Sequence, residues 1–484
     1  MRKFGNIIVN EYIKILMKIS TIVMLVAVVV VAVGYNGLRV MEDWQTQQWS
    51  NNSYYYQSYD EEINWVKAEK YDGWEERVAV LTFLKENDIT QNYYDDDYWT
   101  NTAVYVMFEQ KEEAKLSSMY GDTAQAEKCQ KRVEELEKAI KYKDWKIYNR
   151  INADIAQDAL DNFEDVDGID SKEQLEIGLW AVKYKFENEV PPFTSNWKNS
   201  LVDGMQNSKS ALINLKSSTS DEQIRKEIAA AEEAVLVGQY RLDNDIRVMT
   251  SKADGVMSGN NDWGARLTFW DVFTTSAMGI NVISVLIIII AGSVISSEFS
   301  TGTVKYLLVN PVKRYKIFIA KYVSVLTFAI LMLLIYYIFN IFLSGIFFGF
   351  GDFAAPYLYV SGGKVMQGSS FLFVASKYLV SSIGMICMAT LAFAISSVAK
   401  SSALSIGAGV FLYVAGWSIV GLMAGFNLDF GRYLIFANLE LNAIVEGISP
   451  FRGQTLPFAL TVIAAYMSVF LLTAWDGFVR RDIK

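Results

Sequence analysis

The sequence predicts an all-α polytopic membrane protein: six transmembrane helices with a large, mainly helical extracellular domain between helices 1 and 2. The chain is 52% hydrophobic with a mean hydropathy of +0.18, which is high for a soluble protein and low for one lying wholly in lipid. Its charge is also divided, because residues 39–266 carry 27 basic and 44 acidic side chains. A membrane bundle and an acidic aqueous domain explain both observations.

Residues 1–18 form the first predicted element, an amphipathic helix at the cytoplasmic surface of the membrane. Apolar side chains recur at helical spacing from Phe4 to Ile19, and Asn10, Lys14 and Lys18 mark an opposite polar stripe. The alternative is that this stretch simply lengthens the first transmembrane helix.

Six apolar stretches reach the roughly 20 residues that cross a bilayer core. The first occupies residues 19–38, and no small-residue cleavage site follows it, so we expect an uncleaved helix. The remaining five belong to residues 271–484. The stretches run approximately Ile19–Leu38, Ala277–Ser296, Tyr322–Phe347, Phe371–Val398, Ala403–Phe426 and Leu456–Trp475.

The distribution of Lys and Arg predicts the orientation, because cytoplasmic loops carry an excess of both. With six spans, four basic segments fall on one side, so both termini are expected in the cytoplasm of a multi-pass cell-membrane protein. Residues 39–270 are then extracellular. The basic residues are Arg2, Lys3, Lys14, Lys18, Lys305, Lys313, Arg314, Lys316, Lys321, Lys400, Arg480, Arg481 and Lys484.

Residues 39–270 should form a helical domain. Cys129, Val133, Leu136, Ile140 and Ile147 follow a 3-4 spacing typical of a helix–helix seam. Either a long antiparallel hairpin or an ordinary helical globule satisfies this pattern.

One acidic stretch, NFEDVDGIDSKEQ, resembles a calcium loop. Counted from its glycine, however, the first position is Phe163 and the twelfth is Gln174, where a calcium loop needs two acids. We therefore expect no metal site.

Composition excludes several classes of function. The chain has no histidine, which removes histidine-based acid–base catalysis, nucleophile pairs and zinc ligation. The spans hold no catalytic carboxylate pair or nucleophile–base pair, so no catalytic residues and no enzymatic activity are expected. No G-x-x-x-x-G-K-[ST] phosphate loop occurs, so this chain is no ATPase. A net charge of −9 argues against a nucleic-acid partner.

The segment 297–316, between the second and third spans, has a sequence pattern that positive charge at a cytoplasmic loop does not explain. A Gly-Thr pair starts a short amphipathic stretch, and a proline ends it. A short helix across the mouth of the bundle can insert into a groove of a soluble partner. The distinctive residues are Glu298, Gly302, Thr303, Leu307, Leu308, Pro311, Arg314 and Lys321.

This run resembles the signature of ABC-2-type transporter permeases, an E…GT…LL…P…R…K pattern between the second and third of six helices. Lys313 departs from the small polar residue that often precedes the Arg. The resemblance implies a permease that dimerises with an identical or different subunit and docks through this segment on a cytoplasmic ABC ATPase. That partner would bind the ATP and Mg, leaving this chain without a cofactor. It further implies an exporter of a peptide, antibiotic or lipid-like substrate, in contact with membrane lipid.

Polar and small residues inside the spans are candidates for the transport path, namely Asn281, Lys377, Gly409 and Gly416. Each has a simpler interpretation: Lys377 can reach the outer interface, and small residues allow close helix contact. The loop 427–455 suits either short re-entrant-type helices or a plain folded loop.

A second hypothesis belongs to another class of protein. The chain could be a membrane-anchored extracellular binding or sensor protein, whose acidic, aromatic outer domain is the working part and whose bundle is mainly an anchor.

Overall fold

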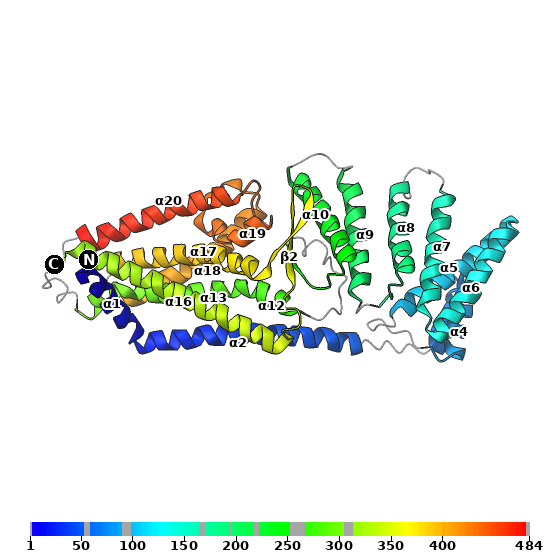
Figure 1. Cartoon of the computed structure of the whole chain (residues 1–484), viewed down its shortest axis with the longest axis horizontal. Helices are drawn as coiled ribbons and strands as arrows, with labels where there is room; N and C mark the ends of the chain where they lie inside the picture. Colours follow the sequence, from blue (N-terminus) through cyan, green and yellow to red (C-terminus); the bar gives the residue numbers. More distant parts are fainter. Residues whose placement is uncertain are drawn as a thin grey trace. The chain divides into compact units, whose positions relative to one another are not determined.

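The computed structural model describes residues 2–52, 59–89, 98–163, 171–193, 196–216, 222–251, 267–303, 313–399 and 401–480. It divides into two compact units (Figure 1). The bundle unit comprises Met1–Val40, Leu267–Tyr357 and Gly368–Lys484, and the insertion unit comprises Met41–Arg266 and Leu358–Gln367.

The bundle unit confirms the predicted all-α polytopic fold. Among the described residues, six helical stretches are long and apolar enough to span a membrane. They are α2 (Ile19–Asn52), α12 with η1 and α13 (Phe269–Thr275, Ser276–Gly279, Ile280–Val294), α16 (Arg314–Phe348), α17 (Ser370–Val398), α18 (Ser402–Gly425) and α20 with η4 (Leu456–Trp475, Asp476–Arg480).

Two of these helices begin earlier than their apolar stretches suggested. The second span starts with α12 at Phe269, where Thr268 and Asp271 form a reciprocal capping box. The third starts at Arg314, because its basic first turns are already helical. The predicted boundary at residue 270 therefore falls inside α12.

The centre of the bundle is formed by α13 and α17, which pack on each other. In addition, α18 contacts both of them and α20 contacts α17. Most of the α13 and α17 side chains are buried, whereas few of those on α2, α18 and α20 are. Lipid or another protein must cover these apolar faces in a membrane.

Helix α1 (Arg2–Leu16) is separate from α2, which starts at Ile19. It packs on α16. The residues between them therefore break the helix, and α1 is not an extension of the first span.

Several chain segments meet at one end of the bundle, which we call the terminal end. Figure 1 shows α1 and the end of α20 there. The ring of Phe318, near the start of α16, lies 5.6 Å from that of Trp475 and 6.2 Å from that of Phe478. Ser296 donates its backbone N–H to Ser396 Oγ at 2.9 Å, which brings α14 (Ser296–Ser300) onto the end of α17.

The opposite end, the loop end, holds residues 349–357 and the connection 427–455. Trp270 donates its indole N–H to the carbonyl of Asp352 at 2.8 Å. The connection 427–455 contains η2 (Asp429–Tyr433), η3 (Ile435–Asn438) and α19 (Leu441–Val445). Of the two alternatives for this loop, the structure has short helices.

The insertion unit is mainly helical, as predicted. Each of its helices packs on the next along the chain. They are α3 (Tyr59–Glu69), α4 (Trp74–Glu86), α5 (Tyr98–Tyr120), α6 (Thr123–Tyr142), α7 (Trp145–Asp161), α8 (Lys172–Glu187), α9 (Trp197–Lys216) and α10 (Glu222–Asn244).

The predicted seam lies on α6, which forms a helical hairpin with α5. Cys129, Val133, Leu136 and Ile140 are buried there. Ile147, however, belongs to α7. The reason is local: Lys143 adopts a left-handed conformation with φ of 53° and ends α6, and Asp144 caps α7.

The connection 351–370 contains a β-hairpin. Strands β2 (Pro356–Ser361) and β3 (Lys364–Ser369) flank Gly362 and Gly363, whose φ angles of 58° and 75° suit a tight hairpin turn. Together with β1 (Thr250–Ser251) they form a sheet of order β1-β2-β3. Leu358 packs with Val237 and Met249, so the hairpin contributes to the insertion unit.

Candidate functional site

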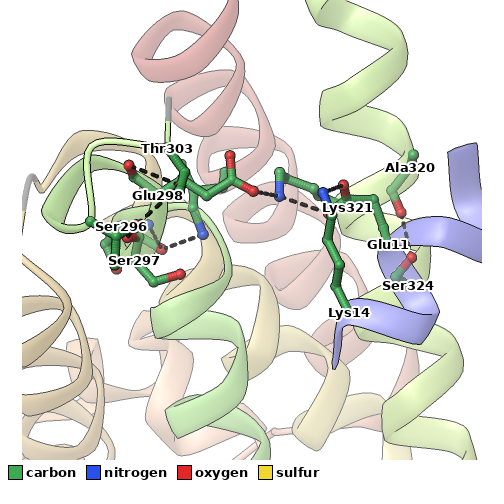
Figure 2. Close-up of polar contacts among 12 residues, drawn as sticks. Glu11, Lys14, Ser296, Ser297, Glu298, Thr303, Ala320, Lys321 and Ser324 are labelled. Atoms are coloured by element: carbon green, nitrogen blue, oxygen red, sulfur yellow. Dashed lines mark hydrogen bonds and ion pairs between the residues drawn. The ribbon is translucent and has the colours of Figure 1, made fainter. Parts of the chain in front are cut away.

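A buried group of charged side chains lies at the terminal end of the bundle. Lys321 on α16 places its Nζ 2.8 Å from Oε2 of Glu11 on α1. The same ammonium pairs with Oε1 of Glu298 on α14. Figure 2 shows Lys321 between these two carboxylates. We call Glu11, Lys321 and Glu298 the charge cluster.

The charge cluster is well shielded from solvent. The side chain of Lys321 is 2% exposed, that of Glu11 is 8% and that of Glu298 is 15%. Removing an ion from water costs several kcal/mol, and only close opposite charges offset that cost. The ammonium and both carboxylates therefore depend on one another.

Glu298 is positioned by a short, firmly bonded turn after the second span. Ser396 Oγ accepts the backbone N–H groups of Ile295 and Ser296, at 3.2 and 2.9 Å. Thr301 donates its hydroxyl to the carbonyl of Ser297 at 2.7 Å. Because the end of α17 satisfies these buried backbone groups, α14 sits against the bundle with Glu298 directed at Lys321.

The Gly-Thr pair continues this turn. Gly302 has a φ of 73°, a conformation that favours glycine. The Thr303 hydroxyl donates to the carbonyl of Glu298 at 3.4 Å. Its oxygen also lies 3.0 Å from the hydroxyl oxygen of Thr301. The two residues therefore end α14 and turn the chain away from it.

Glu11 is positioned by the packing of α1 on α16. Ile15 is buried on the same face of α1, and Ser324 of α16 donates its hydroxyl to the carbonyl of Ile8 at 3.5 Å. Lys14, one turn further, donates to Oε1 of Glu11 at 2.7 Å. Burial raises the pKa of Glu11, but the ammonium groups of Lys321 and Lys14 outweigh it and hold the pKa below its usual value.

One carboxylate oxygen in the charge cluster has no partner. Oε2 of Glu298 is buried and accepts no hydrogen bond from the described residues. A buried acceptor without a hydrogen bond costs about 1–3 kcal/mol of stability.

The predicted coupling residues divide into three groups. Glu298, Gly302 and Thr303 come together at α14, and Arg314 begins α16. Leu307, Leu308 and Pro311 lie outside the described residues.

Sequence reasoning missed Glu11. It is the only acidic residue among the first 40, and a lone acid on an amphipathic helix was the one available signal.

The candidates for the transport path lie in a second polar group, toward the loop end. Asn281 donates its amide to Oε1 of Glu440 at 2.8 Å and accepts from the Tyr413 hydroxyl at 3.1 Å. Lys377 pairs with Glu446 at 2.7 Å. Both residues therefore hold the connection 427–455 against α13 and α17.

The two glycine candidates allow close packing on α18. A Cβ at Gly409 would lie 2.8 Å from Cγ2 of Ile288 on α13. A Cβ at Gly416 would lie 2.2 Å from the ring of Phe436 in η3. These positions match the simpler expectation of small residues at helix contacts.

The charge cluster links chain elements to one another, and its described side chains show no arrangement of metal ligands. Across the described ranges, no group of three or more His, Cys, Asp or Glu residues could hold a metal ion. The charge cluster instead joins α14 and α16 to α1, with Glu11 and Lys321 310 positions apart in sequence. Displacing one of these elements leaves a buried charge without its partner.

Comparison with known proteins places this chain among bacterial relatives. A protein family described as "Protein of unknown function (DUF2705)" matches residues 252–484, which include α12 to α20. The "Uncharacterized protein YhcI" of Bacillus subtilis is 34% identical over 254 residues, covering 52% of this chain and 76% of the relative. The "Uncharacterized membrane protein YdbK" of the same organism is 27% identical over 204 residues, 42% of this chain and 78% of that protein. No solved structure matches the chain significantly.

Proposed function

The chain belongs to the family of Bacillus subtilis YhcI, and we propose that it is the membrane-spanning permease subunit of an ABC exporter of the ABC-2 type. It lies in the cell membrane with both termini in the cytoplasm and residues 39–270 outside. It works with a cytoplasmic ABC ATPase and a second permease subunit, and it moves a peptide, antibiotic or lipid-like substrate outward.

The observation that carries this proposal is the charge cluster. Glu298 stands at the start of the segment 297–316, which resembles the ATPase-docking segment of such permeases. Its carboxylate reaches Lys321 on a spanning helix, and the same ammonium reaches Glu11 on α1. A displacement of the docking segment would therefore move α16 and α1 with it, because separating a buried ion pair costs several kcal/mol.

The arrangement of basic segments supports the proposed orientation. The helix α1, the start of α16 and the end of α20 lie together at the terminal end. These segments carry much of the excess Lys and Arg that marks cytoplasmic loops. The connection 427–455, at the loop end, carries only two basic residues, Arg432 and Arg452.

The chain itself supplies no energy source under this proposal. Its sequence has no phosphate loop, so ATP and its Mg are bound by the partner ATPase. The contribution of this chain is the route across the membrane and the docking surface.

The test is co-purification with an ATPase. The full chain is expressed together with the ABC ATPase of the same organism whose gene lies nearest its own, in wild-type form and as the double variant Leu307→Asp, Leu308→Asp. Because two carboxylates on the docking face would prevent burial against the partner, we expect the variant to reach the membrane without retaining the ATPase.

The matched control is Ile448→Asp, which adds a carboxylate at an exposed apolar position toward the loop end. It should retain the ATPase. Equal retention by all three proteins, or no ATPase bound to wild type, would overturn the proposal. The second result would favour the membrane-anchored binding or sensor protein, whose function requires no ATPase.

A further inference from the structure

Among the residues of α1 whose side chains the structure describes, 7–16, one face packs on the bundle and another is exposed. Glu11 and Ile15 are buried against α16. Val9, Ile13 and Met17 are 55%, 44% and 77% exposed. Val9 and Ile13 lie one turn apart on α1. Met17 directly follows the helix, and its backbone N–H still donates to the carbonyl of Ile13 at 2.9 Å, which keeps it in line with them. We call these three residues the apolar stripe.

Two lysines accompany the apolar stripe, Lys14 on α1 and Lys18 in the bend that follows it. Lys14 and Lys18 are four residues apart, and each directly follows a member of the apolar stripe in sequence. The side chain of Lys14 is 57% exposed even while it bonds Glu11. Lys18 is exposed, and among the described side chains no carboxylate pairs with it.

The local charges do not balance. Among the described side chains of this region, the ammonium groups of Lys14, Lys18 and Lys321 outnumber the carboxylates of Glu11 and Glu298. Burial by the surrounding protein and the nearby Lys321 lower the pKa of Lys18. A negative group from outside the chain would offset this excess.

The apolar stripe continues toward a surface that must face a membrane. Ile19, Ile22, Val23 and Val26 on α2 are exposed apolar residues. They begin a helix long and apolar enough to cross a bilayer. The apolar stripe thus lies next to the point where the chain enters the hydrocarbon core, and the lysines lie at the level expected of lipid phosphates.

We propose that the apolar stripe with Lys14 and Lys18 is a binding surface for an anionic phospholipid. The acyl chains pack on Val9, Ile13 and Met17, and the headgroup phosphate pairs with the two lysines. An apolar line beside an ammonium line fits an amphipathic anion. A soluble anion would leave the apolar stripe uncovered, and a neutral lipid would leave the charge excess in place.

This surface has a consequence for the charge cluster. Lys14 donates to Oε1 of Glu11 while Lys321 holds Oε2. A headgroup that draws Lys14 away leaves Lys321 as the remaining cation paired with Glu11. Anionic lipid would therefore tighten the link between α1 and α16, whether or not an ATPase docks on this chain.

The test measures equilibrium binding of fluorescent phosphatidylglycerol to the detergent-solubilised full chain. Phosphatidylcholine with the same acyl chains and inorganic phosphate form the second and third arms. Wild type should prefer phosphatidylglycerol to phosphatidylcholine, and inorganic phosphate should not compete. Lys18→Gln should reduce that preference about fivefold, because one lysine near an anionic lipid surface raises the binding affinity by about that factor.

The matched control is Lys364→Gln, which removes one exposed lysine from the start of β3; its preference should equal that of wild type. Ile13→Asn should weaken the binding of both lipids equally. Equal affinity of wild type for the two lipids, an unchanged preference in Lys18→Gln, or competition by inorganic phosphate would overturn the inference. No ATPase takes part in any arm, so this outcome is separate from that of the proposed function.

Discussion

The two units use similar ion-pair geometry in different surroundings. In the insertion unit, Lys85 lies 2.6 Å from Asp60, with both side chains about half exposed or more. In the bundle unit, Lys321 lies 2.8 Å from Glu11, with both side chains buried. Exposed pairs contribute about 0–1 kcal/mol, whereas breaking a buried pair costs about 3–5 kcal/mol. Burial, and not distance, decides which pair matters.

The largest expected effect comes from Lys321→Ala. It leaves Glu11 and Glu298 buried together without their shared cation, and we expect the free energy of unfolding to fall by about 3–5 kcal/mol. Denaturant unfolding of the full chain in detergent measures it. The triple variant Glu11→Gln, Lys321→Met, Glu298→Gln should recover most of the loss. A loss below about 1 kcal/mol in Lys321→Ala would mean that the charge cluster is solvated, like the exposed pairs.

A smaller effect is expected from adding one methyl group to the bundle. Gly416→Ala would place a Cβ 2.2 Å from the Phe436 ring, so η3 must shift, at a cost of about 1–3 kcal/mol. Gly421→Ala on the same helix meets no atom within 4 Å and should be neutral or slightly stabilising. Thermal unfolding of both variants makes the comparison, and equal melting temperatures would contradict the packing described here.

The pH dependence of Glu11 gives a further test. Its pKa is lowered from the ordinary value of 4.5, so its ionised form stabilises the fold fully above pH 4.5. That contribution is lost as the pH falls through the lowered value. The stability difference between wild type and Glu11→Gln should therefore be constant above pH 4.5 and shrink below it. A difference that instead grows on acidification would show that burial outweighs the lysines.

The smallest effect is expected from Asp60→Asn in the insertion unit. Its partner Lys85 is about half exposed, and water and salt screen the pair. We expect a change within about 0.5 kcal/mol in the same denaturant assay. A loss approaching that of Lys321→Ala would break the distinction between the two units.

Much of the fold follows from local patterns in the sequence. The six spans were predictable because apolar length alone identifies them, and the seam of α6 because its spacing does. Helix ends were less accurate. The capping box at Thr268 and the basic first turns of α16 lie outside the apolar stretches, so hydropathy could not show them.

The candidate site was only half predictable. Glu298, Gly302 and Thr303 form a local pattern, whereas Glu11 and Lys321 are separated by 310 positions and no periodicity connects them. The partners of Lys377 and Asn281 were missed for the same reason. Glu446 and Glu440 lie in a connection whose path depends on the packing of glycines such as Gly416.

Because the β2–β3 hairpin belongs to the insertion unit, removing that unit requires deletions at two places in the chain. Deleting residues 41–266 alone would leave strands 358–361 and 364–367 between two spanning helices, with Leu358 deprived of Val237 and Met249. An exposed strand edge invites pairing with other chains. A soluble form of the insertion unit would equally lack a strand that its own continuous segment cannot supply, so it needs the ten residues from Leu358 to Gln367 grafted after β1.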